Sequence, residues 1–244
     1  MRLFVISDVH GFYDEMINSL NEAGFNKDTD MLISLGDNID RGKQPKEVID
    51  YLYSLPNKIL IRGNHEDLFQ DACMRGYPLY HDYCNGTHQS ICMLNNDDVY
   101  CSQYHNLKKD TDCYRYRCII SNDMVDCFET KNYIFVHSFL PTKKELGREY
   151  VINNWKEAEN SKWEDARWGN PFELMKTVLN IPKKTIVFGH FHTSYANKMD
   201  GKCIEEFGEG ADFSINYGGN YIGIDACTAH SHKVNCLVLE DELI

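Results

Sequence analysis

The chain has 244 residues, which is enough for one α/β domain with a large core and too few for two full catalytic domains. Its 25 Lys and Arg against 37 Asp and Glu give a formal net charge of −12 at pH 7. This acidity argues against a broad basic surface, so we expect no nucleic-acid partner and no binding to anionic membranes. Any anion that the protein binds must be held by a few local residues.

The N-terminal segment contains no long apolar stretch. A short apolar run, Leu3–Ile6, is followed at once by Asp8, which leaves no room for the hydrophobic region of a signal peptide or for a membrane span. We therefore expect a cytoplasmic protein whose ten cysteines are free thiols. Seven of them lie between Cys73 and Cys127 without a CxxC pair. Two interpretations stay open for this group, namely buried thiols or a structural zinc site completed by His81, His88 or His105.

Predicted strands alternate with predicted helices along the first part of the chain. Helical spacing predicts helices over Tyr13–Ala23 and Pro45–Leu55, and the second opens with a proline suited to a first helical turn. Short apolar runs rich in Val, Ile and Phe predict buried strands, which together with the helices indicate a largely parallel sheet with crossover helices. The five runs are Arg2–Ser7, Met31–Leu35, Lys58–Ile61, Tyr133–Val136 and Thr185–Phe188.

Two later regions differ from this pattern. Residues 77–131 have weak periodicity and many Asn, Asp, Tyr and Cys, and they carry a basic cluster of Lys108, Lys109, Arg115 and Arg117. We interpret them as a partly helical insertion or cap within a single domain that spans residues 1–244. The C-terminal third contains Asp212–Tyr217, Tyr221–Asp225 and Val234–Glu240, separated by polar or Gly-containing turns. This spacing predicts antiparallel strands of a second sheet.

A polar cluster stands at the end of each of the five predicted strands. Ligands bind outside the carboxyl ends of strands in open α/β sheets, so we expect these clusters to converge in space. Their carboxylate, amide and imidazole groups suit divalent ions such as Mn, Fe or Zn. One cluster alone would be weak evidence, because an Asp before a helix is often only an N-cap, but five at strand ends favour a shared site. In chain order they are Asp8-Val-His10-Gly11, Gly36-Asp37-Asn38-Ile39-Asp40-Arg41-Gly42, Gly63-Asn64-His65-Glu66, His137, and Gly189-His190-Phe191-His192.

The ordered motifs DVHG, GDNIDRG, RGNHE, VHS and GHFH resemble those of the calcineurin-like metallophosphatase superfamily. The DRG and RGNHE forms resemble its phosphoprotein phosphatase branch, which includes bacterial and phage protein phosphatases and symmetrical dinucleoside tetraphosphate hydrolases. The resemblance extends from Met1 to about Leu239 and is weakest over residues 77–126. It implies a four-layer α-β-β-α sandwich of two mixed sheets flanked by helices, with a partly helical insertion.

The resemblance also implies two divalent metal ions, with manganese as the expected ion in vitro and iron or zinc as alternatives. Asp37 would bridge the two ions. His192 would be a further ligand to the first ion, or a hydrogen-bond donor beside a ligand. The remaining ligands would be Asp8 and His10 for the first ion, and Asn64, His137 and His190 for the second.

Roles in catalysis and substrate binding follow from the same resemblance. His65 would be the general acid that protonates the leaving oxygen, and Asp40 would orient its ring. Arg41 would bind the substrate phosphate, since a guanidinium matches phosphate geometry, and Asn64 would contact the same phosphate. Arg62 would do likewise or would be a structural ion-pair partner. Arg167 is the one later arginine that fits a further phosphate-binding position, and Trp163 and Trp168 are expected to pack in the core or the cap.

Three functions are compatible with these residues. The first is a metal-dependent phosphoesterase that hydrolyses phosphomonoesters through a metal-bridging hydroxide, with phosphoserine or phosphothreonine in proteins as substrate. The second is a symmetrical dinucleoside tetraphosphate hydrolase that uses the same metals. The third is a non-catalytic binding module on the same scaffold, which the presence of every expected ligand and of the acid argues against.

Overall fold

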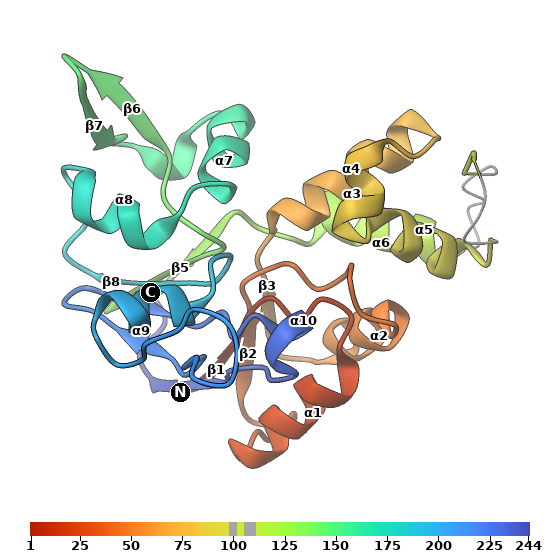
Figure 1. Cartoon of the computed structure of the whole chain (residues 1–244), viewed down its shortest axis with the longest axis horizontal. Helices are drawn as coiled ribbons and strands as arrows, with labels where there is room; N and C mark the ends of the chain where they lie inside the picture. Colours follow the sequence, from red (N-terminus) through yellow and green to blue (C-terminus); the bar gives the residue numbers. More distant parts are fainter. Residues whose placement is uncertain (98–101, 105–110) are drawn as a thin grey trace.

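Two mixed β-sheets form the centre of the protein (Figure 1). The computed structural model describes residues 1–97, 102–104 and 111–244. The first sheet has the order β11-β1-β2-β3, in which β1 (Arg2–Ile6), β2 (Met31–Ser34) and β3 (Lys58–Leu60) are parallel. Strand β11 (Leu237–Glu240) pairs antiparallel with β1, with Leu3 opposite Leu239.

The second sheet has the order β4-β5-β8-β10-β9. Its three central strands, β5 (Tyr133–Val136), β8 (Thr185–Phe188) and β10 (Tyr221–Gly223), are parallel. Its two edge strands, β4 (Cys127–Glu129) and β9 (Asn216–Tyr217), run antiparallel to their neighbours. The carboxyl ends of β5 and β8 therefore lie at one edge, as do those of β1, β2 and β3 in the first sheet.

Alternating side chains of the strands build three buried layers. Leu3, Val5 and Val187 belong to the layer between the two sheets. Phe4 and Phe188 point the other way, into the layers beneath the helices. Both faces of each sheet are thus covered, which explains why the strands read as continuous apolar runs.

Helices cover the outer faces of both sheets and complete a four-layer sandwich. Helices α1 (Tyr13–Glu22) and α2 (Pro45–Ser54) pack on the first sheet. Helices α7 (Asn160–Arg167), α8 (Pro171–Thr177) and α9 (Thr193–Met199) pack on the second. A separate hairpin of β6 (Thr142–Glu145) and β7 (Arg148–Val151) precedes α7 along the chain, with a 3-10 turn at Trp155–Glu157 between them, and a short helix α10 (Thr228–Ser231) follows β10.

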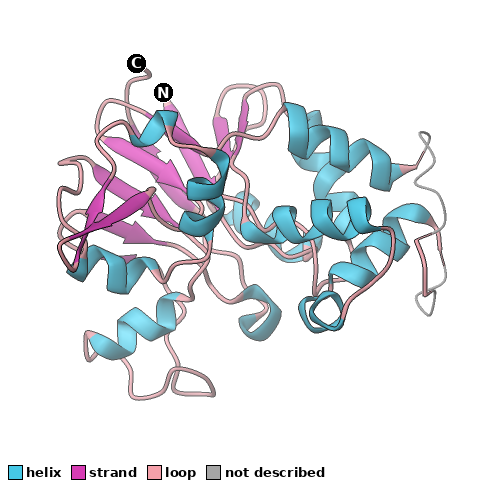
Figure 2. Cartoon of the chain, turned by 90° about the horizontal axis from the view of Figure 1, so that it is seen from above, coloured by secondary structure: helices cyan, strands magenta, loops and turns pink. Residues whose placement is uncertain are grey.

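A group of helices follows β3 and lies to one side of the strands (Figure 2). It consists of α3 (Asn64–Arg75), α4 (Tyr80–Asn85), α5 (Thr87–Asn95) and α6 (Asp112–Asn122). The last three helices and β4 fall within the predicted insertion, whose limits at residues 77 and 131 stay a prediction. Lys108 and Lys109 of its basic cluster lie outside the described residues.

The α/β fold class, the two predicted helices and the five predicted strands are confirmed, each within one or two residues. The prediction for the C-terminal third is wrong in one respect. Strand β11 belongs to the first sheet, beside β1, and only β9 and β10 join the second. Within the described part of the chain, no helix is both long enough and apolar enough to cross a membrane.

Candidate active site

The strand ends that carry the polar clusters adopt an unusual backbone conformation. Among the described residues, eleven other than glycine have positive φ, and six of these belong to the clusters. Such conformations cost on the order of 1–3 kcal/mol each and persist where the surroundings hold them, which is typical of functional sites. The six are Asp8, His10, Asp37, Asp40, Arg41 and His190.

Two glycines allow the loops to approach each other closely. A Cβ atom at Gly63 would lie 2.1 Å from Oδ1 of Asp37, and one at Gly189 would lie 2.2 Å from Oδ2 of Asp8. Any larger residue would push these carboxylates out of place. The glycines of the RGNHE and GHFH motifs are therefore required by packing around the acidic side chains.

His10, Asp37 and His65 form the first group of possible metal ligands. Nδ1 of His10 lies 2.9 Å from the carbonyl oxygen of Ile39, so Nδ1 donates and Nε2 is left as an acceptor. Nε2 of His10 lies 3.8 Å from Oδ2 of Asp37, and Nε2 of His65 lies 3.9 Å from the same oxygen. Burial and the nearby Arg41 charge lower the pKa of His10 well below its usual value, which keeps the ring neutral.

Asp37, His137 and His190 form the second group, and Asn64 lies among them. Nδ1 of His137 donates to the carbonyl oxygen of Leu35 at 2.8 Å. Its Nε2 lies 2.8 Å from Oδ1 of Asn64 and 3.2 Å from Nδ1 of His190. Burial lowers the pKa of His137 to about 4 and that of His190 to about 3, the latter helped by the His137 ring. The two groups share Asp37, whose Oδ1 lies 3.5 Å from Nε2 of His137.

Buried carboxylates crowd the same region. Asp8, Asp37 and Asp225 are each at most 6% exposed. Burial, followed by the charges of Asp225 and Asp37, raises the pKa of Asp8 well above its usual value. Burial also raises the pKa of Asp225, to about 6. Buried negative charges require a compensating positive charge, and neutral imidazoles supply none.

These observations fit divalent metal ions. Lone pairs of neutral imidazoles, an amide oxygen and carboxylate oxygens converge, and the second nitrogen of His10 and of His137 is held by a backbone carbonyl. That arrangement is the usual support for a metal-ligating histidine. The donor set of oxygen and nitrogen atoms matches Mn, Fe or Zn without distinguishing among them.

His65 of the first group also forms a hydrogen-bonded pair with Asp40. Nδ1 of His65 lies 2.7 Å from Oδ2 of Asp40, and its Nε2 lies 3.2 Å from Nη2 of Arg41, whose side chain is exposed. Burial tends to lower the pKa of His65, but the carboxylates of Asp37 and Asp40 more than compensate and raise it. The geometry places Nδ1 of His65 against a carboxylate and its Nε2 toward an arginine, next to the other metal-binding residues.

Glu66 holds this site together, and its role was missed by the sequence analysis. Its Oε2 accepts hydrogen bonds from the backbone N–H groups of Asp37 and Gly63, and its Oε1 accepts from Asn38 and from the Tyr116 hydroxyl at 2.8 Å. The fully buried side chain thus joins the β2 loop to the start of α3. The available signal was its place three residues after Gly63, because a carboxylate at that position commonly accepts from the backbone N–H of the residue that caps a helix.

The other predicted arginines lie in an ion-pair network. Asp67 pairs with Nε of Arg62 at 2.6 Å and with Nε of Arg167 at 2.6 Å. Arg167 is 4% exposed and also donates to Asp126 at 2.7 Å. Its charge still contributes to lowering the pKa of His137. Both arginines therefore stand close to the site with carboxylate partners, and their contact with a phosphate stays a prediction.

His192 lies outside both metal-binding groups of the described residues. Its Nε2 lies 3.3 Å from Glu206 and its Nδ1 3.0 Å from the Ser194 hydroxyl. Trp163 is buried as expected, whereas Trp168 is 51% exposed and lies edge-on to His190, so the expectation of core or cap packing is wrong for Trp168.

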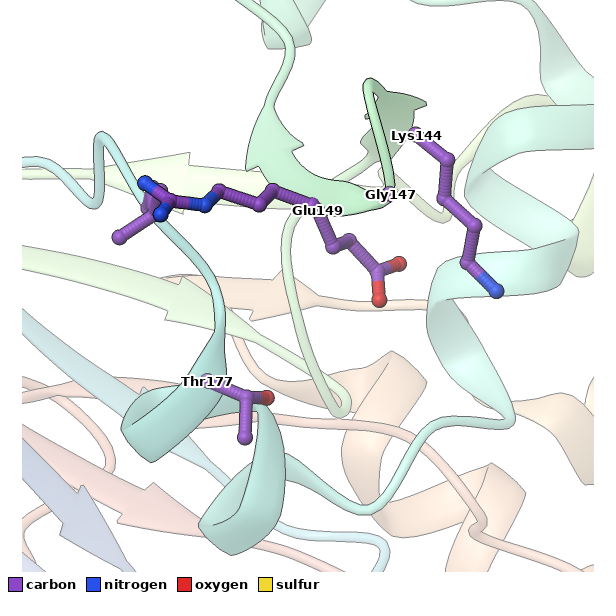
Figure 3. Close-up of a pocket in the computed structure, with 6 residues that line it drawn as sticks. Lys144, Gly147, Glu149 and Thr177 are labelled. Atoms are coloured by element: carbon purple, nitrogen blue, oxygen red, sulfur yellow. The ribbon is translucent and has the colours of Figure 1, made fainter.

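A cavity elsewhere in the protein is lined by none of the metal-binding residues. This cavity of about 400 Å³ lies at the β6–β7 hairpin, where Lys144 and Glu149 reach from the strands and Thr177 from the end of α8 (Figure 3).

The described cysteines are not part of the metal-binding groups. Among the described residues, neither group contains a cysteine, and nine cysteines are free thiols. His105 of the possible zinc site lies outside the described residues.

Comparisons with known proteins agree with this geometry. Residues 1–233 match the family model described as calcineurin-like phosphoesterase. The chain is 44% identical over 71 residues to serine/threonine-protein phosphatase 2 of Salmonella typhimurium, which covers 29% of the chain and 32% of the relative. It is 43% identical over 67 residues to the symmetrical bis(5'-nucleosyl)-tetraphosphatase of Salmonella paratyphi B, covering 27% and 24%. The aligned part thus spans about a third and a quarter of these relatives.

Solved structures share the fold over nearly the whole chain. A protein serine/threonine phosphatase from Saccharomyces cerevisiae has a TM-score of 0.59 at 13% identity and covers 100% of this chain and 80% of its own. A cold-active protein-tyrosine phosphatase of a Shewanella species has a TM-score of 0.55 at 16% identity, covering 98% and 75%. At these identities the likeness concerns the fold alone. The family match over residues 1–233 shows that the chain belongs to the calcineurin-like phosphoesterase family.

Proposed function

We propose that this protein is a metal-dependent phosphoesterase that hydrolyses phosphomonoesters, with phosphoserine and phosphothreonine residues of proteins as its substrates. One observation carries the proposal. The His65–Asp40 pair adjoins His10 and Asp37, and Asp37 belongs to both groups of possible metal ligands. Hydrolysis of a phosphate ester requires cations that neutralise the phosphoryl charge and an acid that protonates the leaving oxygen, and this arrangement provides for both.

Two divalent metal ions would be held by the strand ends. Asp8 and His10 would bind one ion, Asn64, His137 and His190 the other, and Asp37 both. When bound, the ions would neutralise the charge of the phosphoryl group and supply an activated water. Manganese is the ion we propose for activity in vitro, with iron or zinc as alternatives. We leave His192 out of the ligand set, because Glu206 and Ser194 already occupy its two nitrogens.

The protein's own residues bind the phosphate and move the proton. Arg41 would bind phosphate oxygens through its exposed guanidinium, 3.2 Å from Nε2 of His65. That nitrogen would then donate its proton to the leaving oxygen, while Asp40 holds Nδ1. Arg62 and Arg167 would strengthen the positive potential at the same place. Each of them pairs with Asp67, which fixes its position beside the site.

A dinucleoside tetraphosphate is the second candidate substrate, because the relatives of both kinds match the chain about equally well. The net charge of −12 favours the phosphoprotein, since four phosphates need more positive charge than a single phosphate. The fold does not decide between them. We propose a cytoplasmic location, in line with the free thiols.

A comparison of substrates tests the proposal. The manganese-loaded protein is given a phosphoserine peptide and diadenosine tetraphosphate at equal concentrations, and kcat/KM is measured for each. We expect a higher value for the peptide. A large preference for the dinucleotide would show that the protein is a dinucleoside tetraphosphate hydrolase and not a protein phosphatase. Failure to hydrolyse even p-nitrophenyl phosphate would indicate a non-catalytic binding module.

A further inference from the structure

The first turn of α5 contacts the backbone and side chain of Asp40 and the backbone of Arg41. The hydroxyl of Thr87 donates to Oδ2 of Asp40 at 2.6 Å, and the backbone N–H of Asp40 donates to Oγ of Ser90 at 3.0 Å. Thr87 and Ser90 are both fully buried. A Cβ atom at Gly86 would lie 2.5 Å from the backbone nitrogen of Arg41. Residues far along the chain from the DRG motif therefore determine its position.

Asp40 and Arg41 require such support. Their φ angles of 74° and 65° are costly for residues other than glycine, so surrounding contacts must hold them. The turn supplies a hydrogen bond to the Asp40 backbone and close packing against Arg41. The turn therefore contributes to holding both residues toward His65.

The carboxylate of Asp40 is oriented through one oxygen. Oδ2 accepts from both Nδ1 of His65 and the Thr87 hydroxyl, whereas the buried Oδ1 has no hydrogen-bond partner among the described residues. Thr87 thus restrains the plane of the carboxylate that meets the histidine. Removing its hydroxyl would leave the soft torsion about the Cβ–Cγ bond of Asp40 held by His65 alone, so the carboxylate would hold the ring less firmly.

We propose that Thr87, together with Gly86 and Ser90, is a positioning residue for the Asp40–His65 pair and for Arg41. The predicted insertion would then complete the site rather than only cover it. This inference rests on the proposed function, because it assigns Thr87 an effect on proton donation by His65. Thr87 itself touches neither the metal groups nor the outer nitrogen of His65 in any described contact.

Three variants separate positioning from simple stability. Thr87→Val removes the hydroxyl and keeps the shape, and Thr87→Ser keeps the hydroxyl. Thr130→Val is the matched control, because Thr130 is also fully buried and donates to a carboxylate oxygen, Oδ2 of Asp241, at 2.6 Å. Kinetics are measured with manganese on phenyl phosphate, a poor leaving group, and on p-nitrophenyl phosphate, a good one.

We expect Thr87→Val to lower kcat on phenyl phosphate about 10-fold or more, a part of the loss expected when a general acid is removed altogether. The loss on p-nitrophenyl phosphate should be smaller. KM and metal content should be unchanged, because Gly86, which packs against Arg41, is kept in this variant. Thr87→Ser should restore kcat, and Thr130→Val should match the wild type. If Thr87→Val does not fold, Ser90→Ala takes its place and should show the same dependence on the leaving group.

A second measurement does not depend on activity. Nitrogen-15 NMR of the histidine rings, with and without metal, reports the Nδ1 proton of His65, and we expect its signal to shift in Thr87→Val and not in Thr130→Val. An unchanged signal and unchanged kcat in Thr87→Val would overturn the inference, as would a loss of activity that Thr87→Ser does not restore. A wild type without phosphatase activity would refute the proposed function instead, and the NMR signal would still decide whether Thr87 positions His65.

Discussion

Both carboxylate oxygens of Asp37 face histidines, Oδ1 toward His137 and Oδ2 toward His10 and His65. Replacing Asp37 by asparagine removes the negative charge common to both metal-binding groups. We therefore expect D37N to lose metal from both groups together and activity with it, as measured by elemental analysis after dialysis. Asp30→Asn, at a buried carboxylate that pairs with Arg2, is the control and should keep its metal. Full metal occupancy in D37N would contradict a shared ligand.

His65 should affect turnover without affecting metal. His65→Asn keeps a polar side chain beside Asp40 but cannot donate a proton to a leaving oxygen. We expect metal content to match the wild type and kcat on alkyl phosphates to fall on the order of 10² or more, the usual scale for a lost general acid. His81→Asn, at an exposed ring beside Asp82, is the control. An unchanged rate for His65→Asn would remove this residue from the mechanism.

The motifs predicted the histidines and acids that the structure brings together, because chemistry restricts residue types where strands end. They did not predict Glu66, Thr87 and Ser90 as supporting residues. These side chains hold the backbone of other loops, and the contacts depend on which loops become neighbours in three dimensions. A single sequence carries no signal for such partners beyond the spacing of Gly63 and Glu66.

At the scale of elements, α6 reaches the site through one hydroxyl. Tyr116 is buried and donates to Oε1 of Glu66, the carboxylate that joins the β2 loop to α3. Tyr116→Phe removes this hydrogen bond and little else. We expect it to lower the free energy of unfolding by about 1–2 kcal/mol, because a buried charged acceptor loses one donor while its backbone donors remain.

Urea denaturation measures this change. Tyr51→Phe provides a control, since Tyr51 also packs against the helical core but is only partly buried. Equal stability of Tyr116→Phe and wild type would mean that α6 packs against the site without supporting it. A loss much above the expected range would show that Glu66 depends on Tyr116 more than on the backbone amides.

Most helices and strands were predictable because the local sequence pattern determines them. Which strands pair with each other was not. The segment Val234–Glu240 was predicted as a strand from the spacing of turns but was assigned to the wrong sheet, since its sequence does not reveal which sheet edge it joins. The β6–β7 hairpin was not predicted at all. Strand β6 carries Lys143, Lys144 and Glu145 in succession and is largely exposed, so it lacks the apolar pattern that marks a buried strand.

At the scale of the whole molecule, the C-terminal residues link the two sheets. Asp241, directly after β11 of the first sheet, accepts hydrogen bonds from Thr130 at 2.6 Å and from the backbone and side chain of Asn132, which precede β5 of the second sheet. Partial burial acts to raise the pKa of Asp241, but these hydrogen bonds lower it to about 2. The charged form is therefore the one that holds the sheets together here.

Asp241→Asn should destabilise the protein in a pH-dependent way. A carboxylate whose folded pKa lies below its unfolded pKa stabilises the fold above the unfolded value, near 4, and loses this effect as the pH falls toward the folded value. We expect the variant to lose about 1–3 kcal/mol at pH 7, the range for hydrogen bonds to a charged group. The difference from wild type should shrink at pH 3, where part of the wild-type carboxylate in the unfolded chain is already protonated.

Glu242→Gln is the control, because Glu242 is next in the chain and forms an exposed pair with Lys131. It should change stability by less than about 0.5 kcal/mol at both pH values. A difference for Asp241→Asn that stays constant from pH 7 to pH 3 would show that shape, and not charge, makes Asp241 the link between the sheets.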